Sequence, residues 1–409
     1  MGFQKKDMFR RSPFTLLAAL LLIPALFPSC SRKERLGTPE EILSTMSVRE
    51  KVSQIIISAT FASSDPEYTS LMDTLMAEGI GGIIWMDAPV GDLVEETNAL
   101  SRKVRIPLLV TVDAEWGLSM RCPDYVKFPK QGVFGKAEGM EDILYEMGVA
   151  VGKDLCDLKI HANFAPVVDI NTNPHVQILG LRSFGSDRDR VTSYALSYMH
   201  GMQDGGILTC AKHFPGHGEA AVDSHVGLPY LDLSRERLDS VELYPYRKLI
   251  GEGVDMVMVA HLSVPALDST LTPTSISKPV ITGLLREELG FEGCIITDAL
   301  EMKGLTTGRD PVQVAKDAFL AGADILLMPS SPIPTIDLLE KSVLSGEIPE
   351  SALDEKVLRV LKVKKKAGLL DEGYSPVVRN LSRKVRAAHR RDTVLMEKIL
   401  SVLPEDNGK

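Results

Sequence analysis

The sequence predicts an α/β fold, a (β/α)8 TIM-type barrel, and three observations lead to this prediction. Eight short apolar runs rich in Val and Ile lie between residues 52 and 329, as is typical of parallel strands buried on both faces. Amphipathic stretches of helical length separate these runs. Polar residues that can carry chemistry stand at the carboxyl ends of five different runs.

The runs and the stretches between them give the expected elements in order. Strands are expected at 54–58, 81–86, 107–113, 161–169, 207–214, 254–261, 293–299 and 323–329. Helices are expected at 70–78, 141–158, 191–204, 234–251, 278–289 and 311–321, and a last helical pattern follows Ser351. Alternating strand and helix units of this kind indicate a parallel sheet.

A doubly wound open sheet could also use eight parallel strands, so the polar residues at the strand ends decide between the two folds. They are Asp113, Asp169, Lys212, His213, His261 and Asp298. A barrel collects side chains from many strands at one face, whereas an open sheet binds its ligand at one switch point. Five contributing strands therefore favour the barrel.

The two ends of the chain are expected to lie outside the barrel. Basic residues precede an apolar run from Phe14 to Phe27, the layout of a secretory signal peptide. The segment that ends at Cys30 resembles a bacterial lipoprotein signal, so we expect a signal at 1–29, a lipidated Cys30 opening a tether at 30–45, the barrel at 46–370 and a tail at 371–409. The alternative is a plain secretory signal. The tail is basic, and a solvated surface helix or a frayed end is expected there.

Composition limits the partners of this 409-residue chain. Its net charge of -9 provides no basic field, which argues against a nucleic-acid binder and against a polybasic membrane-surface protein. A small or neutral ligand is expected, with contact to a membrane through the lipid anchor only. The cysteines after Cys30 match no zinc spacing, and Cys210 and Cys294 lie in strand-like runs where a buried thiol is usual.

The segment 212–225, KHFPGHGEAAVDSH, concentrates histidines in a glycine-broken stretch. Asp223 and His225 are two residues apart, so in an extended loop the carboxylate can hold and charge the imidazole to make an acid/base unit. Taken alone, an Asp-x-His is more often a loop staple. A metal site made with His213 and His217 is a weaker alternative, because Pro215 and Gly216 prevent the helix that an HxxxH pair needs. No metal and no cofactor are expected.

Asp298 ends an apolar run on stiff backbone, which suits a nucleophile or a metal ligand. Capping of a following helix is an equally good interpretation, since Glu301 stands three residues later as in a capping box. Near Asp113, Trp116 offers an apolar face of the kind that stacks on sugar rings. Charged side chains gathered at one barrel mouth would bind many hydroxyl groups.

Several ordered blocks together resemble glycoside hydrolase family 3, in its β-N-acetylhexosaminidase branch. They include KHFPGHG followed by DSH, NFAPVVDI with RSFG, VMVAH with PALD, and ITGLLREELGF leading into TDALEM, within residues 46–370. The resemblance implies Asp298 as the nucleophile and His225 with Asp223 as the acid/base pair. It also implies that the terminal N-acetylglucosamine is held by Asp113, Arg121, Arg182, Lys212 and His213. Trp116 departs from the family, where glycine is common.

The activity implied is retaining hydrolysis of terminal N-acetylglucosamine from exported glycans such as peptidoglycan fragments or chitooligosaccharides. Phosphorolysis is an alternative, because a histidine acid that has given up its proton does not repel an anionic acceptor. A lipoprotein that binds glycans without cleaving them is the alternative from another class. The β-glucosidase branch fits less well, since it typically draws its acid from a second domain.

Overall fold

The computed structural model describes residues 36–404 except 174–178 and 219–226. Residues 36–404 belong to one compact unit. The signal segment and Cys30 lie outside the described residues, as do Asp223 and His225. None of the helices within the described ranges combines the length and apolarity that a bilayer span requires.

Eight parallel strands form the sheet, in the order β7-β6-β5-β4-β3-β2-β1-β8. They are β1 Ile56–Thr60, β2 Gly82–Trp85, β3 Leu109–Val112, β4 Ala162–Asn163, β5 Leu208–Phe214, β6 Met256–Val259, β7 Cys294–Thr297 and β8 Leu326–Leu327. A parallel bridge between Ile296 and Ile325 joins β7 to the start of β8 and closes the barrel. The barrel prediction is confirmed, and each expected run overlaps one strand, although β1 continues to Thr60, beyond the expected end at Ser58.

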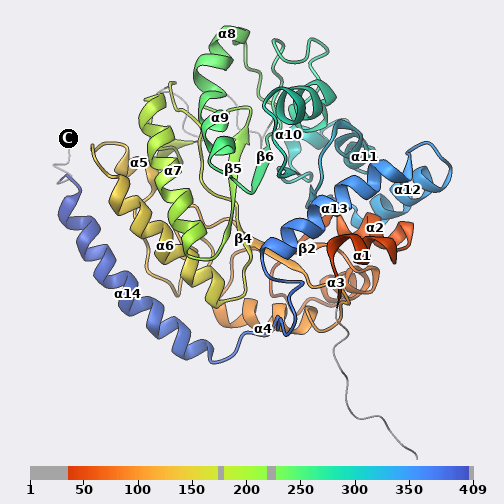
Figure 1. Ribbon diagram of the computed structural model, residues 1–409, viewed down its shortest axis with the longest axis horizontal. Coiled ribbons are helices and arrows are strands. Elements are labelled where there is room, and N and C mark those ends of the chain that lie inside the picture. Colours follow the sequence, from red (N-terminus) through yellow and green to blue (C-terminus); the bar gives the residue numbers. More distant parts are fainter. Residues whose placement is uncertain (1–35, 174–178, 219–226, 405–409) are drawn as a thin grey trace, which may run out of the picture. The chain divides into compact units, whose positions relative to one another are not determined.

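Helices surround the sheet (Figure 1). They are α1 Pro39–Ser44, α2 Val48–Gln54, α3 Pro66–Glu78, α4 Val90–Leu100, α5 Gln131–Phe134, α6 Glu141–Asp157, α7 Arg188–Asp204, α8 Arg235–Arg237, α9 Tyr244–Gly251, α10 Lys303–Thr306, α11 Pro311–Ala321, α12 Pro332–Leu344, α13 Glu350–Lys366 and α14 Leu381–Val402. Single turns occur at η1 Leu118–Met120, η2 Gly180–Arg182 and η4 Thr274–Ile276, and wider helical turns at η3 Leu238–Glu242 and η5 Pro279–Glu288.

Local sequence explains where many of these helices begin. Ser47 and Glu50 form a capping box at α2, in which each side chain accepts a hydrogen bond from the other residue's backbone N–H. Asp187 and Asp310 accept hydrogen bonds from the first turns of α7 and α11. Gly79 ends α3 in the left-handed conformation, with φ of 72°, which glycine adopts without steric cost.

The strands are buried as their composition predicts. Every residue of β2, β3, β5, β6 and β7 is buried. Cys210 and Cys294 lie among them as free buried thiols, and Cys122 and Cys156 are also unpaired. The strand ends are therefore fixed by packing on both faces, which gives the side chains that follow them a rigid base.

Helix α13 ties the amino-terminal ends of several strands together. Lys364 Nζ lies 2.7 Å from Oε1 of Gln54, just before β1. Arg359 and Lys366 pair with Asp324 and Asp255, which stand before β8 and β6. These contacts occupy the end of the barrel opposite the carboxyl ends of the strands.

Helix α14 packs against α6, and Figure 1 shows it running beside that helix. Ala388, Leu395 and Ile399 are buried on its inner face. Lys384 Nζ lies 2.6 Å from Asp157, and Lys398 Nζ lies 2.5 Å from Glu146. The basic residues of this segment thus include partners of acidic groups on α6, and the helix is more firmly attached than the solvated or frayed end that the sequence suggested.

Candidate active site

A cavity of about 440 Å³ opens at the carboxyl ends of the strands. Its lining residues come from β2, β5, β6 and β8 and from the loops that follow the strands. They are Ile84, Met86, Asp113, Glu115, Met120, Arg121, Leu179, Arg182, Lys212, His213, His217, Met258, Asp298, Ala299, Glu301, Met302, Leu327 and Met328. Six residues that the sequence suggested for sugar binding or nucleophilic attack all line this cavity. They are Asp113, Arg121, Arg182, Lys212, His213 and Asp298.

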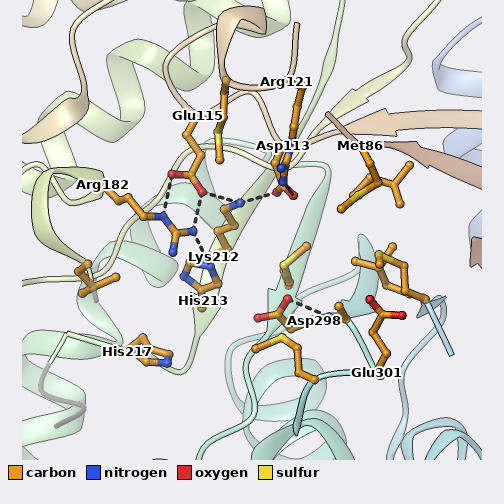
Figure 2. A pocket seen from close by; sticks show the side chains of 18 residues that line it. Met86, Asp113, Glu115, Arg121, Arg182, Lys212, His213, His217, Asp298 and Glu301 are labelled. Carbon is orange, nitrogen blue, oxygen red and sulfur yellow. Dashed lines mark hydrogen bonds and ion pairs between the residues drawn. The ribbon is translucent and has the colours of Figure 1, made fainter. Parts of the chain in front are cut away.

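One wall of the cavity is a chain of alternating charges (Figure 2). Lys212 Nζ lies 2.7 Å from Oδ1 of Asp113 and 2.8 Å from Oε1 of Glu115. Arg182 donates to the same Glu115 carboxylate through Nη2 at 2.6 Å and Nε at 3.0 Å. Arg121 Nη2 lies 2.9 Å from Oδ2 of Asp113. We refer to Asp113, Glu115, Arg121, Arg182 and Lys212 as the charged wall.

These pairings hold every member of the charged wall in its ionised form at neutral pH. Burial would raise the pKa of Asp113, but the positive charges of Lys212 and Arg121 outweigh burial and lower it. For Glu115 the same balance, with Lys212 and Arg182, lowers the pKa far below its usual 4.5. Burial would lower the pKa of Lys212, but the negative charges of Asp113 and Glu115 outweigh burial and raise it. The wall therefore presents fixed, oriented charges to a ligand.

His213 stands beside the charged wall in a defined tautomer. Its Nε2 lies 3.3 Å from Nη2 of Arg182, and because a guanidinium group only donates, Nε2 accepts that hydrogen bond. The proton is then on Nδ1, which donates to Oδ2 of Asp169 at 2.7 Å. Asp169 also accepts from the backbone N–H of His217 at 2.7 Å. Asp169 thus fixes both the ring of His213 and the turn that carries His217.

His217 also lines the cavity, a position that the sequence did not predict for it. Its ring is buried, and Nδ1 has no hydrogen-bond partner among the described residues. Burial lowers the pKa of this imidazole. His217 is therefore a neutral group at the cavity edge at neutral pH.

Asp298 follows β7 and directs its carboxylate into the cavity, between His213 and Glu301 (Figure 2). Oδ1 accepts a hydrogen bond from the N–H of Ala299 at 2.8 Å. Burial alone would raise the pKa of Asp298, but the imidazoles of His213 and His261 and the Ala299 N–H together lower it below 3.8. An ionised carboxylate on a rigid strand end is the chemical form that a nucleophile needs.

The helix-cap alternative for Asp298 is wrong. The next helix, α10, begins at Lys303, and its N-cap is Met302 without a side-chain hydrogen bond. The turn after Asp298 is instead held by His261, whose Nε2 lies 2.9 Å from the carbonyl oxygen of Ala299. Since a carbonyl only accepts, Nε2 donates, and Nδ1 accepts from the hydroxyl of Ser275 at 2.6 Å.

The opposite wall is apolar. Its side chains come from β2, β6 and β8 and from the residues that follow β2, β7 and β8, and are Ile84, Met86, Met258, Met302, Leu327 and Met328. Methionine is flexible and polarizable, so this wall adapts to the shape of an apolar group. Asp298 lies apart from the charged wall, with Glu301 beyond it (Figure 2).

Two expectations about this region need correction or remain outside the structure. Trp116 does not line the cavity; the Nζ of Lys130 lies 4.7 Å above its ring centre instead. Asp223 and His225 lie outside the described residues, so their predicted roles remain predictions. In the described part of the chain, no three His, Cys, Asp or Glu side chains are grouped to hold a metal ion.

The fold and the cavity define a barrel protein whose polar site lies at the carboxyl ends of its strands, where barrel enzymes place their catalytic groups. The family model described as the glycosyl hydrolase family 3 N-terminal domain matches residues 47–363. The chain therefore belongs to glycosyl hydrolase family 3, as the sequence blocks indicated.

Similar proteins carry related names. A protein named beta-hexosaminidase A, from Pseudoalteromonas piscicida, is 32% identical over 340 residues, which are 75% of this chain and 56% of that relative. Beta-hexosaminidase LpqI of Mycobacterium tuberculosis is 34% identical over 344 residues, 80% of this chain and 85% of the relative. The solved structure of the beta-glucoside phosphorylase BglX bound to 2FGlc gives a TM-score of 0.81 at 26% identity, covering 88% of this chain and 66% of its own.

Proposed function

We propose that this protein is a retaining β-N-acetylhexosaminidase that removes terminal N-acetylglucosamine from glycans. The observation that carries the proposal is the position of Asp298, an ionised carboxylate in the same cavity as the charged wall and the apolar side chains. A sugar bound with its anomeric carbon at Asp298 would present its hydroxyl groups to one wall and its C2 substituent to the other. The names of the two hexosaminidase relatives support the same activity.

The two walls suit the two kinds of group that N-acetylglucosamine carries. Ionised side chains hydrogen-bond hydroxyl groups strongly, and Asp113 and Arg121 at the entrance are partly exposed for this purpose. The acetamido methyl is apolar and fits against the methionine side chains opposite. Burial of one methyl group favours binding by about 0.8 kcal/mol, or about 4-fold. A glucoside lacks this group, so the pocket would select the N-acetylated sugar.

The proposed reaction has two steps. Asp298 attacks the anomeric carbon and forms a glycosyl ester while the leaving oxygen takes a proton. We assign that proton to His225, charged by Asp223, and the same imidazole then takes a proton from the water that breaks the ester. Lys212, Arg182 and His213 hold the sugar in place through both steps.

A direct assay tests this proposal. Wild-type protein should release nitrophenol from 4-nitrophenyl β-N-acetylglucosaminide and act at least about 4-fold less well on the β-glucoside. Asp298→Asn should abolish release, whereas Asp204→Asn, which removes an exposed surface carboxylate, should not change it. A fluorinated sugar should label a peptide that contains Asp298. Wild type equal to Asp298→Asn would instead support a binding protein without catalysis.

Phosphorolysis is the second candidate, and the similarity to BglX is the observation that favours it. The two reactions share the glycosyl ester and differ only in the acceptor that breaks it. Products formed with and without phosphate separate them. Sugar 1-phosphate as the main product would replace hydrolysis with phosphorolysis.

We also propose that the protein is exported and anchored through Cys30. The support is the order of basic, apolar and cysteine-containing segments in residues 1–30. Substrates in an exported compartment would be peptidoglycan fragments or chitooligosaccharides. Labelling with a radioactive fatty acid should mark the wild type and not Cys30→Ala, and an unlabelled wild type would contradict the anchor.

A further inference from the structure

Glu301 occupies a special place in the cavity. It stands three residues after Asp298, and Figure 2 shows its side chain beyond Asp298 on the side away from the charged wall. Among the residues that line the cavity, all within the described ranges, Glu301 is the exposed one. Because its side chain both lines the cavity and is exposed, solvent and a group that enters from solvent can reach its carboxylate.

The cations of the cavity are already matched by carboxylates. Lys212 contacts Asp113 and Glu115, and Arg182 contacts Glu115. The third cation, Arg121, contacts Asp113 and also Asp87, whose side chain is 74% exposed. An anionic group that entered the mouth would have to compete with these carboxylates for a cation.

Glu301 itself has no such match. In the described structure no hydrogen bond or ion pair to its carboxylate is formed, whereas Asp113, Glu115 and Asp298 each accept hydrogen bonds. Its neighbour Met302 is apolar and lines the same cavity, and burial raises the pKa of Glu301 above 4.5. Above that pKa it is an uncompensated negative charge beside an apolar surface, where fields are screened less than in water.

We infer that Glu301 is a specificity-determining residue that selects neutral or cationic leaving groups over anionic ones at the mouth of the cavity. This inference rests on the proposed hexosaminidase function. It narrows the glycans to those in which an uncharged or amine-bearing sugar follows the terminal N-acetylglucosamine, as in chitooligosaccharides or their partly deacetylated forms. Glycans whose next sugar carries a carboxylate are disfavoured, and so is phosphate as an acceptor.

The size of the effect follows from Coulomb's law. Two like charges about 7 Å apart repel each other by about 0.6 kcal/mol at the dielectric constant of water and about 1.2 kcal/mol at half that constant. These energies correspond to about 3-fold and about 7-fold in rate. Because the site is exposed, added salt should reduce the discrimination.

Two matched substrates measure the selection. The probes are the β-N-acetylglucosaminides of 4-nitrophenol bearing a 3-carboxylate or the isosteric 3-carboxamide. The measured quantity is the ratio of kcat/KM for the carboxamide to kcat/KM for the carboxylate. Wild type should give a ratio of about 3 to 7, Glu301→Gln a ratio near 1, and Glu301→Lys a ratio below 1. The control Glu292→Gln removes an exposed carboxylate that does not line the cavity and should keep the wild-type ratio.

The outcomes separate this inference from the function on which it rests. Hydrolysis of the carboxamide substrate with a ratio that Glu301→Gln and Glu301→Lys leave unchanged overturns the role of Glu301 and leaves the hexosaminidase intact. A wild type that hydrolyses neither substrate overturns both. If Glu292→Gln lowers the ratio as much as Glu301→Gln does, the net charge of the protein, and not Glu301, causes the selection. That result would also overturn the inference.

Discussion

Replacing Glu115 by Gln tests whether the charged wall orients the groups that bind sugar. Glu115 is fully buried and receives one contact from Lys212 and two from Arg182. Glutamine keeps the shape of the side chain, but it removes the negative charge and turns an NH2 group toward one of the two cations. Both cations then remain in the wall with less compensation.

The magnitude can be worked from these contacts. Loss of one partner from a buried ion pair destabilises a protein by about 3–5 kcal/mol, so the free energy of unfolding should fall by that amount. If Lys212 or Arg182 moves enough to lose one charge-assisted hydrogen bond to the sugar, transition-state binding weakens by about 1.5–3 kcal/mol. That loss corresponds to about 10- to 150-fold in kcat/KM.

The assay combines urea unfolding with steady-state hydrolysis of 4-nitrophenyl β-N-acetylglucosaminide at a temperature where the variant stays folded. Glu138→Gln is the matched control, because Glu138 is 89% exposed and its pairing with Arg190 should matter little. The contrary result is a Glu115→Gln variant that keeps kcat/KM within about twofold of wild type and its free energy of unfolding within about 0.5 kcal/mol. In that case the charged wall would not depend on Glu115, and our account of its electrostatics would be refuted.

Two further predictions concern stability and the turn near the site. Burial lowers the pKa of Lys364 from 10.5 to about 7. The unfolded chain therefore binds this proton more tightly than the folded protein does. The free energy of unfolding should rise with pH between about 7 and 10.5, by up to about 1.4 kcal/mol per pH unit. Lys364→Met should remove that slope in unfolding measured against pH, while Lys362→Met, exposed on the same helix, should keep it. A Cβ on Gly218 would lie 1.8 Å from the backbone oxygen of Ile170, so Gly218→Ala should destabilise the protein by about 1–3 kcal/mol and reduce hydrolysis. Gly283→Ala, with open space around its Cβ, should do neither, and equal melting temperatures for the two variants would contradict the clash.

The barrel was predictable because its strands are apolar throughout and its polar residues follow them. Helices α4 and α12 were not predicted. The start of α12 reads SSPIPT, a pattern typical of loops, yet its prolines lie in the first turn, where the missing N–H has no helical partner to lose. The Asp298 to Glu301 spacing matched a capping box, but that pattern does not show whether a helix follows.

The site was predictable to the extent that its residues end strands. Asp113, Lys212 and Asp298 do so and were found. Glu115 lies three residues beyond β3 in an irregular loop, and only the closed barrel brings it to Lys212 and Arg182. Trp116 was expected near sugar because of its residue type, but its ring packs under Lys130, a contact that no local pattern indicates.

The attachment of α13 to the floor of the barrel has a consequence for synthesis. Lys364 and its acceptor Gln54 are separated by 310 positions in the chain. During translation, β1 and the side-chain amide of Gln54 therefore remain without these partners until nearly the whole barrel has been synthesised. Long-range pairing of this kind is slow, and it leaves hydrophobic surface exposed while the chain folds. We therefore expect chaperones to bind this barrel during its synthesis.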